Sequence, residues 1–365
     1  MASNIRKLYM DNLRWMILLV LIPYHASQAW NTWGEPNYIF IEGNPLISSI
    51  IVFFSPYFMP LLFVLSGMST VYALQKRTYK EYLYERVKRL LVPFLLGTIV
   101  LMPVMSYIGD KFNDSYNEGF LKHYIIFFTK WTDLTGADGG FSVGQFWFLL
   151  YLLVISFVSV GIIVLLEKVV PKAGKSMPFW LILLLGLPIP VFSDWLSIGG
   201  KSLAEYTYFF LLGYYVFANE ETVCKLEKHR LVLFGIGLVS TILNVYLFLW
   251  TDGDYAFVND IMKYVSKWFM VIALIGLAKR YLNFTGSVSE YMSKRSFLFY
   301  FYHFIWVVLF QYILYGIVGN QTAILFVGTV LLSYLATFAC CEIHRILRIL
   351  FAALVFTFCN RKESV

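Results

Sequence analysis

Long apolar runs alternate with short polar stretches along almost the whole chain. Ten runs stand out, at residues 13–32, 50–74, 90–108, 146–166, 179–193, 204–218, 231–250, 264–280, 296–318 and 322–343. A helix needs about 20 predominantly apolar residues to span a bilayer, and most of these runs reach that length. The fifth and sixth are shorter, and short or interrupted segments often line a cavity instead of facing lipid. The pattern predicts an all-α fold, a polytopic membrane helix bundle of about ten transmembrane helices.

Composition supports the same class of protein. Hydrophobic residues make up 59% of the 365 residues, charged residues make up 14%, and mean hydropathy is +0.68. Ordinary soluble domains contain about 45–50% apolar and about 25% charged residues. Aromatic residues reach 19%, which suits belts at the membrane interfaces and a stacked cavity within the membrane. We therefore expect a multi-pass protein of the cell membrane.

Lys and Arg residues gather in alternate connections between the runs. The basic connections carry Lys76, Arg77, Lys80, Arg86, Lys88, Arg89, Lys168, Lys172, Lys175, Lys279, Arg280, Lys294 and Arg295. The opposite connections carry Asp110, Asp114, Asp133, Asp138, Asp252, Asp254 and Asp260. The positive-inside rule then predicts that both termini are cytoplasmic. The net charge of +7 lies beside the apolar runs and not in one stripe, so it does not indicate nucleic-acid binding.

We expect one integral-membrane domain over residues 1–350 and a cytoplasmic C-terminal tail over residues 351–365. The first run does not read as a cleaved signal peptide, because Asp11 and Arg14 stand at its start and no A-x-A site closes it. The largest outer loop, over residues 109–145, is long enough to form a lid or a surface for an acceptor.

The first run contains an unusual pair of ionisable residues, Arg14 and His25. Ionisable residues inside a membrane segment are costly, so they are functional candidates by default. Eleven residues at about 100° each come within about 20° of three full turns, which places both side chains on one helix face. The rise of about 16 Å places His25 near mid-membrane if Arg14 lies at the surface. Pro23 is expected to kink the helix and to free a backbone carbonyl near the imidazole.

Other polar groups lie in or beside the runs. They are Asp11 near Arg14, Ser66-Gly67 in the second run, Arg86 and Arg89 before the third, His303 in the ninth, and Glu342 and His344 at the inner end of the tenth. Each group has a second interpretation: a lone His is often a satisfied packing residue, Ser-Gly often serves helix packing, and juxtamembrane arginines often only fix topology. The residues alone leave these alternatives open. No H-E-x-x-H motif or carboxylate cluster indicates a metal, so none is expected.

In order and spacing, these motifs resemble the integral-membrane acyltransferase-3 family. The matching segments are Arg14-x10-His25, Leu62-Phe-Val-Leu-Ser-Gly67, Arg86-x-x-Arg89-x-x-x-Pro93, Gln145-Phe-Trp-Phe-Leu149, Ser296-Phe-Leu-Phe-Tyr300-x-x-His303 and Glu342-Ile-His344. The last two are similar to the branch that succinylates periplasmic glucans. The chain departs from that branch at Gln145 and Tyr302, where the branch has His. The resemblance therefore defines the reaction class more closely than the substrate.

The resemblance implies transfer of an acetyl or succinyl group from cytoplasmic acyl-CoA to a hydroxyl of an extracytoplasmic glycan or related acceptor. His25 would act as general base, with His303 as the next candidate. An oxyanion donor is also needed, and Ser66-Gly67, Trp147 and Tyr300 remain alternatives. The residues assigned to acyl-CoA binding are Asp11, Arg14, Arg86, Arg89, Glu342 and His344.

Two other classes remain open from the sequence. A secondary transporter also needs mid-membrane ionisable residues and broken helices, and a catalytically silent membrane scaffold or sensor would need neither donor nor acceptor. For the acyltransferase, the expected partners are acyl-CoA, a carbohydrate or polysaccharide acceptor and the lipid bilayer, and a homodimer is kept open.

Overall fold

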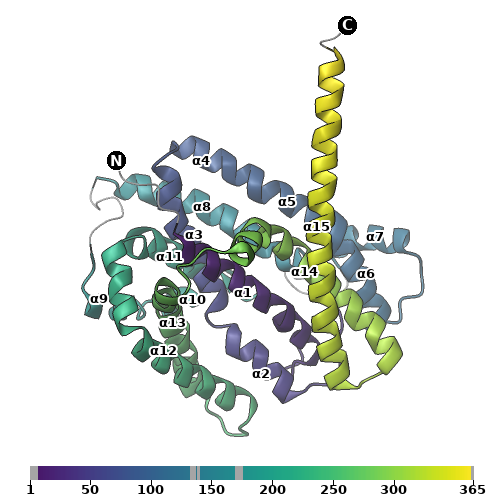
Figure 1. The fold of residues 1–365 in the computed structure, drawn as a ribbon. Coiled ribbons are helices and arrows are strands. Elements are labelled where there is room, and N and C mark those ends of the chain that lie inside the picture. Colours follow the sequence, from purple (N-terminus) through teal and green to yellow (C-terminus); the bar gives the residue numbers. More distant parts are fainter. Residues whose placement is uncertain (1–6, 132–136, 138–139, 169–175, 363–365) are drawn as a thin grey trace.

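The chain forms a bundle of helices of very different lengths (Figure 1). The computed structural model describes residues 7–131, 137, 140–168 and 176–362, the last part from 352 onward as backbone only. Seven helical segments in the described residues are long and apolar enough to cross a membrane: Pro45–Leu74, Tyr79–Asn113, Gly144–Leu166, Glu220–Leu249, Ala256–Tyr281, Ser287–Val318 and Thr322–Phe351. The prediction of an all-α, polytopic membrane bundle is confirmed.

The elements follow one another in chain order. They are α1 (Leu8–Ser27), η1 (Gln28–Trp30), α2 (Pro45–Phe54), α3 (Phe58–Leu74), α4 (Tyr79–Arg86), η2 (Val87–Leu91), α5 (Val92–Leu96), η3 (Gly97–Leu101), α6 (Met102–Asn113), α7 (Phe120–Thr129), η4 (Gly144–Phe146), α8 (Trp147–Leu166), α9 (Phe179–Leu184), α10 (Ile189–Ser193), β1 (Ser197–Ile198), β2 (Lys201–Ser202), α11 (Leu203–Leu212), η5 (Gly213–Phe217), α12 (Glu220–Leu249), α13 (Ala256–Tyr281), α14 (Ser287–Val318) and α15 (Thr322–Lys362). Strands β1 and β2 form a short antiparallel hairpin. Elements η2, η3 and η5 are π-helical turns within longer helices.

Three of the ten predicted spans lie on helices outside those seven segments. They are 13–32 on α1, 179–193 on α9 and α10, and 204–218 on α11 and η5. Pro188 and Pro190 divide the second of these into two short helices, since proline removes a backbone donor and clashes with the preceding turn. The number of spans, ten, stays a prediction, as does the cytoplasmic location of both termini.

Two helices extend into segments that the sequence assigned to a loop and to a tail, and the division into a domain and a tail stays a prediction. Helix α7 occupies part of the predicted outer loop, because the face carrying His123 and Phe127 is buried against α6. Helix α15 continues through the expected domain boundary at residue 350 as far as Lys362. The predicted topology residues Asp133, Asp138, Lys172 and Lys175 lie outside the described residues.

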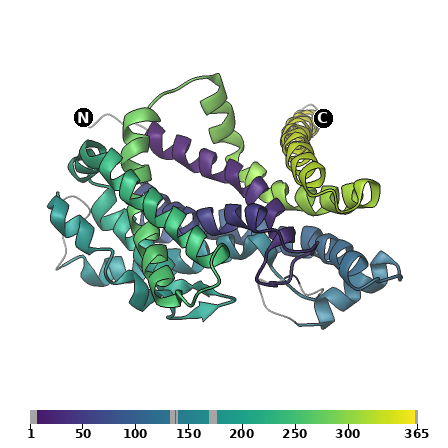
Figure 2. The same cartoon turned by 90° about the horizontal axis from the view of Figure 1, so that it is seen from below.

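Helix α1 lies inside the bundle and contacts α14, α13, α2 and α15 (Figures 1 and 2). Its start is fixed by the buried side chain of Asn12. The Asn12 amide donates to the carbonyls of Leu282 and Phe284 at 2.7 and 2.9 Å, and its oxygen accepts from Trp15 and Ser289. The connection between α13 and α14 therefore holds the N-terminal end of α1.

Close backbone contact joins α3 to α11 and η5. A Cβ atom on Gly67 would lie 1.9 Å from the Phe210 carbonyl oxygen, and one on Gly213 would lie 2.2 Å from the Val64 carbonyl oxygen. Only glycine allows this approach, which is the small-residue packing typical of membrane helices. The packing interpretation of Ser66-Gly67 is therefore confirmed for Gly67.

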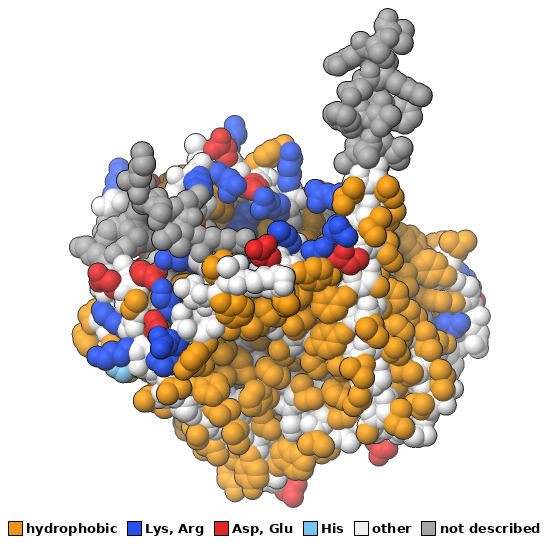
Figure 3. Space-filling view, viewed as in Figure 1, with side chains coloured by type: hydrophobic (Ala, Val, Ile, Leu, Met, Phe, Trp, Pro, Cys, Tyr) orange, Lys and Arg blue, Asp and Glu red, His pale blue; other side chains and the backbone are white. Residues whose placement is uncertain are grey.

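Charge is distributed unevenly on the surface. In Figure 3, Lys and Arg side chains gather in the upper part of the visible face, above a broad hydrophobic band that faces outward. The exposed large apolar side chains include Val239, Leu331 and Leu335 on α12 and α15. A continuous apolar surface of this kind is stable only in contact with lipid or a partner. The arrangement fits a bundle with its basic end at one membrane interface.

Candidate active site

One face of α1 lines two separate cavities. Arg14 and Leu18 line a first cavity, and Leu21 and His25 line a second. These positions follow the i, i+4, i+7, i+11 spacing of a single helix face. The prediction that Arg14 and His25 share a face is confirmed. Helices α3, α8 and α14 also contribute to both linings, so these three helices and α1 are shared by the two cavities.

The first cavity, here called the basic cavity, has a volume of about 430 Å³. Its charged lining residues are Arg14, Arg77, Arg86, Arg89 and Glu85, a formal balance of +3. Three of these arginines are the ones the sequence assigned to the donor. Such a concentration of guanidinium groups suits a ligand with several phosphates, because each guanidinium can bind two oxygens at once.

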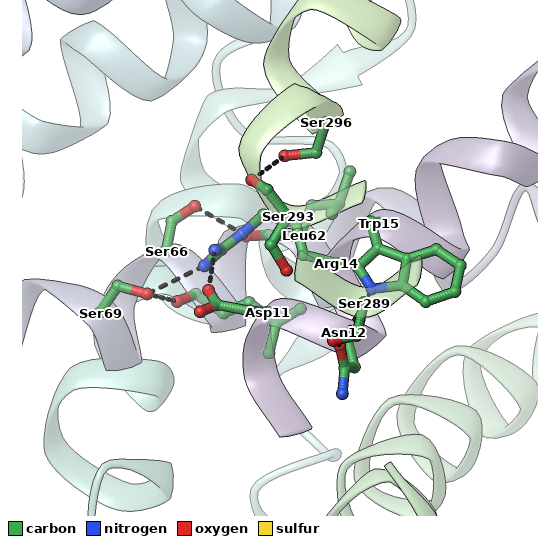
Figure 4. A network of polar contacts seen from close by, with 11 residues as sticks. Asp11, Asn12, Arg14, Trp15, Leu62, Ser66, Ser69, Ser289, Ser293 and Ser296 are labelled. Carbon is green, nitrogen blue, oxygen red and sulfur yellow. Dashed lines mark hydrogen bonds and ion pairs between the residues drawn. The ribbon is translucent and has the colours of Figure 1, made fainter. Parts of the chain in front are cut away.

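Arg14 is held from two sides at the wall of the basic cavity (Figure 4). Its guanidinium donates to the Asp11 carboxylate at 3.1 Å on its own helix and to the Ser69 hydroxyl at 2.9 Å on α3. Asp11 therefore lies beside the predicted donor site through its pairing with Arg14. The Ser66 hydroxyl, on the same face of α3, donates to the Leu62 carbonyl at 2.8 Å.

Arg86 and Arg89 are positioned differently although they belong to one motif. A capping box formed by Thr78 and Glu81 starts α4, which continues into the π-helical turn η2. Arg86 donates to the Tyr82 hydroxyl at 2.9 Å and contacts Thr70 at 3.4 Å. Arg89 is 73% exposed and pairs with Glu85 at 2.6 Å. Arg86 is thus fixed before any ligand arrives, whereas Arg89 lies at the mouth.

The second cavity, here called the histidine cavity, measures about 410 Å³. The cavity is enclosed by the ends of α1, α3 and α8 and the middle of α14. The segment 31–38, the turn 199–201 and Tyr206 of α11 also belong to its lining. Its lining is rich in aromatic rings, among them Tyr24, Trp33, Trp147, Tyr206 and Phe304, and in neutral polar side chains, among them Gln28, Asn31, Asn37 and Gln145. One acidic and one basic residue, Glu35 and Lys201, also belong to this lining. The combination suits a ligand with both hydroxyls and apolar faces.

His25 is oriented by its neighbours within this cavity. Its ring stacks on Phe304 with centroids 4.1 Å apart, and its Nδ1 lies 2.9 Å from the Gln28 side-chain oxygen. An amide oxygen only accepts, so Nδ1 donates and Nε2 holds the lone pair. A neutral imidazole in this tautomer can accept a proton at Nε2, which is the requirement for a general base.

His303 lies next to His25, with ring centroids 5.3 Å apart, but it is fully buried. Its Nδ1 donates to the Tyr300 carbonyl at 2.6 Å, and its Nε2 has no hydrogen-bond partner among the described residues. His303 belongs to neither cavity lining within the described part of the chain. It adjoins the histidine cavity through His25, Tyr300 and Phe304, which belong to the described lining.

Leu62 and Tyr300 belong to both linings, so the two cavities meet at these side chains. The Tyr300 hydroxyl donates to the backbone carbonyl of Gln145 at 2.5 Å, which ties α14 to the start of α8. We call Leu62 and Tyr300 the partition. A group that passed from the basic cavity to His25 would have to cross it.

The remaining predicted residues divide into two sets. Trp147 lines the histidine cavity, where its ring lies 5.4 Å from the Lys201 ammonium. Glu342 and His344 instead lie between α14 and α15: Glu342 accepts from Arg295 and Arg345, and His344 contacts Tyr302 at 3.1 Å. The described linings of both cavities leave these two residues out.

Pro23 lies within α1, and one part of the expectation for it, a freed backbone carbonyl, is confirmed. It leaves the carbonyl of Leu19 without its helical donor, and the hydroxyl of Tyr334 on α15 donates to that carbonyl at 2.7 Å. The freed carbonyl is therefore used to fasten α15 to α1. Its position close to the imidazole of His25 stays a prediction.

Sequence reasoning missed several lining residues. Arg77 was predicted only as a topology signal. Gln28 was not singled out, although it stands three residues after His25, in the 3₁₀ turn η1 that continues α1. Gln145 was predicted as part of a segment that matches the family and as a departure from the glucan branch, with no role in the site. A signal was present for Gln28, since i, i+3 neighbours on a helix are within contact distance.

Comparison with known proteins gives one result. The family model described as an acyltransferase domain, Acyl_transf_3, matches residues 7–341. The comparisons with curated proteins and with solved structures found no match. The matched segment includes every residue that lines the two cavities. With its apolar helices and this nearly full-length match, the chain belongs to the acyltransferase-3 family and is a membrane acyltransferase.

Proposed function

We propose that the protein transfers an acetyl or succinyl group from cytoplasmic acyl-CoA to a hydroxyl of an extracytoplasmic glycan or related acceptor. The observation that carries the proposal is the meeting of two cavities at Leu62 and Tyr300, with arginines on one side and His25 on the other. An acyltransferase that joins substrates from opposite sides of a membrane needs two such compartments and one contact between them.

The basic cavity supports acyl-CoA as donor. Four arginines against one glutamate give a site for the phosphates of CoA, and Arg86 already has its guanidinium held by Tyr82. The predominance of Lys and Arg at this end supports a cytoplasmic location, where acyl-CoA is made. The thioester would then point along α1 toward the partition.

The histidine cavity supports a carbohydrate acceptor. Aromatic faces can pack against the C–H faces of a sugar ring, while amide side chains can donate to and accept from its hydroxyls. In the cell membrane, this site would face the side opposite to the cytoplasm, where the donor is. His25 is the only histidine in the described lining of this cavity. The hydrogen bond from its Nδ1 to Gln28 leaves the lone pair on Nε2.

The chemistry follows from these positions. His25 Nε2 takes the proton of the acceptor hydroxyl as its oxygen attacks the thioester carbonyl. The tetrahedral intermediate then collapses, the carbon–sulfur bond breaks, and His25 returns the proton to the CoA sulfur. The products are the acyl ester and free CoA, and no redox step or metal is required.

The test uses purified protein with acetyl-CoA or succinyl-CoA and a hydroxyl acceptor, following release of the CoA thiol. We expect His25→Ala to keep thermal stabilisation by acyl-CoA, since a ligand that binds the native state raises stability. Transfer should fall by about 10²–10⁴-fold, the usual contribution of general acid–base catalysis. His229→Ala is the matched control, because His229 stacks on Phe179 away from both described linings.

Two results would contradict the proposal. The first is wild-type protein that neither binds acyl-CoA nor releases its thiol in the presence of an acceptor. The second is a folded His25→Ala variant that transfers at close to the wild-type rate, which would remove His25 from the chemistry.

A further inference from the structure

The side chain of Gln145 is buried in the histidine cavity without a partner. Only 4% of Gln145 is exposed, and the residue belongs to the cavity lining. Neither its Oε1 nor its Nε2 has a hydrogen-bond partner in the part of the chain that the structure describes. A buried amide that lacks partners destabilises a protein, so such a group calls for an explanation.

The backbone places this amide beside the partition. Gln145 lies in the single turn η4 that precedes α8, and its carbonyl accepts the hydrogen bond from Tyr300. The adjacent Gly144 has a φ of +45°, a conformation that other residues rarely adopt, so the backbone of this turn requires glycine there. The backbone of Gln145 is thus held against Tyr300 of the partition, and the residue faces the histidine cavity.

Other candidate donors at this place are already engaged. The Tyr300 hydroxyl donates to the Gln145 carbonyl, and the Ser66 hydroxyl donates to the Leu62 carbonyl. The backbone amides of Ser66 and Gly67 lie in the interior of α3, where N–H groups are used by the helix. Among the earlier alternatives, this leaves Trp147, whose ring faces Lys201.

We propose that Gln145 Nε2 donates a hydrogen bond to the acyl carbonyl oxygen as it becomes an oxyanion. The inference rests on the proposed function. When the acceptor oxygen attacks the carbonyl carbon, the carbonyl double bond opens and negative charge moves to its oxygen, next to the Gln145 amide. When the carbon–sulfur bond breaks, the carbonyl double bond re-forms and the oxygen loses its negative charge. The electron pair leaves with the CoA sulfur, which takes the proton from His25. A donor fixed in advance is effective because it need not reorganise during the reaction.

The test compares turnover with stability in purified full-length protein. Gln145→Met removes the donor and keeps a similar shape, and we expect kcat to fall by about 10²-fold, the usual loss of one oxyanion donor. The KM for acyl-CoA should stay unchanged. The melting temperature should rise, because an unpaired buried amide is replaced by an apolar side chain. Gln145→His should keep part of the turnover, since an imidazole N–H can also donate.

The matched control is Asn244→Leu. Asn244 is another buried amide, placed on α12 outside both described linings, and its Nδ2 lies 3.5 Å from the Val52 carbonyl. Its replacement should leave kcat unchanged. If Gln145→Met does not fold, Gln145→Asn serves instead, because the shorter side chain withdraws the donor and should lower kcat in the same way.

Several results would overturn the inference. Gln145→Met with lower stability and unchanged kcat would make Gln145 a packing residue. A large loss of kcat in Trp147→Phe with none in Gln145→Met would assign the oxyanion to Trp147. If the wild-type protein transfers no acyl group, the proposed function fails and this inference fails with it, which is a different result from an active but insensitive variant.

Discussion

Arg86 and Arg89 should contribute unequally to donor binding, although they stand in one Arg-x-x-Arg motif. Arg86 is half-buried, and its guanidinium is fixed by the Tyr82 hydroxyl at 2.9 Å and lies 5.0 Å from the Tyr82 ring centroid. Arg89 is 73% exposed and already paired with Glu85. Arg86 therefore spends little further conformational entropy on binding a phosphate, whereas Arg89 must exchange a carboxylate partner and remains in solvent.

The expected magnitudes follow from these environments. A hydrogen bond to a charged group is worth about 1.5–3 kcal/mol, and about 1.4 kcal/mol corresponds to a tenfold change in affinity. Arg86→Ala should therefore raise the Kd for acyl-CoA by about 10- to 150-fold. An exposed ion pair contributes about 0–1 kcal/mol, so Arg89→Ala should raise Kd by about fivefold at most. Arg86→Lys should recover only part of the loss, because the planar fork is missing.

Acyl-CoA binding is best measured by thermal titration of the purified protein, alongside initial rates at saturating donor. Lys88→Ala is the matched control, since it removes the same charge from a position between the two arginines. Lys88 lies over the Tyr84 ring, outside the described lining of the basic cavity. Equal losses for Arg86 and Arg89, or no loss for either, would refute the assignment. The two arginines would then act only as topology signals.

Three further predictions test the architecture around the site. Leu62→Ala should open the partition and shift donor preference toward longer acyl chains, measured by thiol release across an acyl-CoA series; an unchanged preference would exclude Leu62 as a limit on chain length. Gly67→Ala should strongly reduce the yield of folded protein, because its Cβ would overlap the Phe210 carbonyl, and a normal yield would contradict the close contact. Asn12→Ala should lower the free energy of unfolding by about 1–3 kcal/mol, the cost of leaving the buried donors of Trp15 and Ser289 unpaired, and no change in the denaturation midpoint would argue against its anchoring role.

Periodicity predicted the parts of the site that depend on one helix. Arg14 and His25 lie on one face because helical geometry fixes side-chain direction over three turns. The same reasoning could not show which helices face α1, since that choice depends on packing between segments far apart in the chain. The convergence of α3, α8 and α14 on this face, and hence the existence of two cavities, comes only from the folded structure.

Residues in motifs were harder to assign than residues on faces. Glu342 and His344 were expected at the donor site, yet Arg295, Arg345 and Tyr302 occupy them at the α14–α15 contact. The sequence does not show which partner a charged side chain will bind when several lie within reach in the fold. Conversely, the unpartnered amide of Gln145 has no sequence signature, because it is defined by what the fold leaves around it.

Reaction class was likewise beyond the residues alone, which fit a transporter, a scaffold and an enzyme. The family match over residues 7–341 decides in favour of a membrane acyltransferase. Identity of the acyl group and of the acceptor depends on the shape and polarity of two cavities of about 430 and 410 Å³. Those properties arise from side chains of many elements and cannot be read from any one of them.

The central claim is that donor and acceptor react from opposite sides of the membrane across the Leu62–Tyr300 partition. The most direct test reconstitutes the protein in sealed vesicles, with labelled acyl-CoA outside and an impermeant glycan acceptor either inside or outside. The account predicts that label reaches the acceptor inside the vesicles, and that His25→Ala abolishes this transfer while the vesicles stay sealed. Labelling only of acceptor that shares a compartment with acyl-CoA would contradict it.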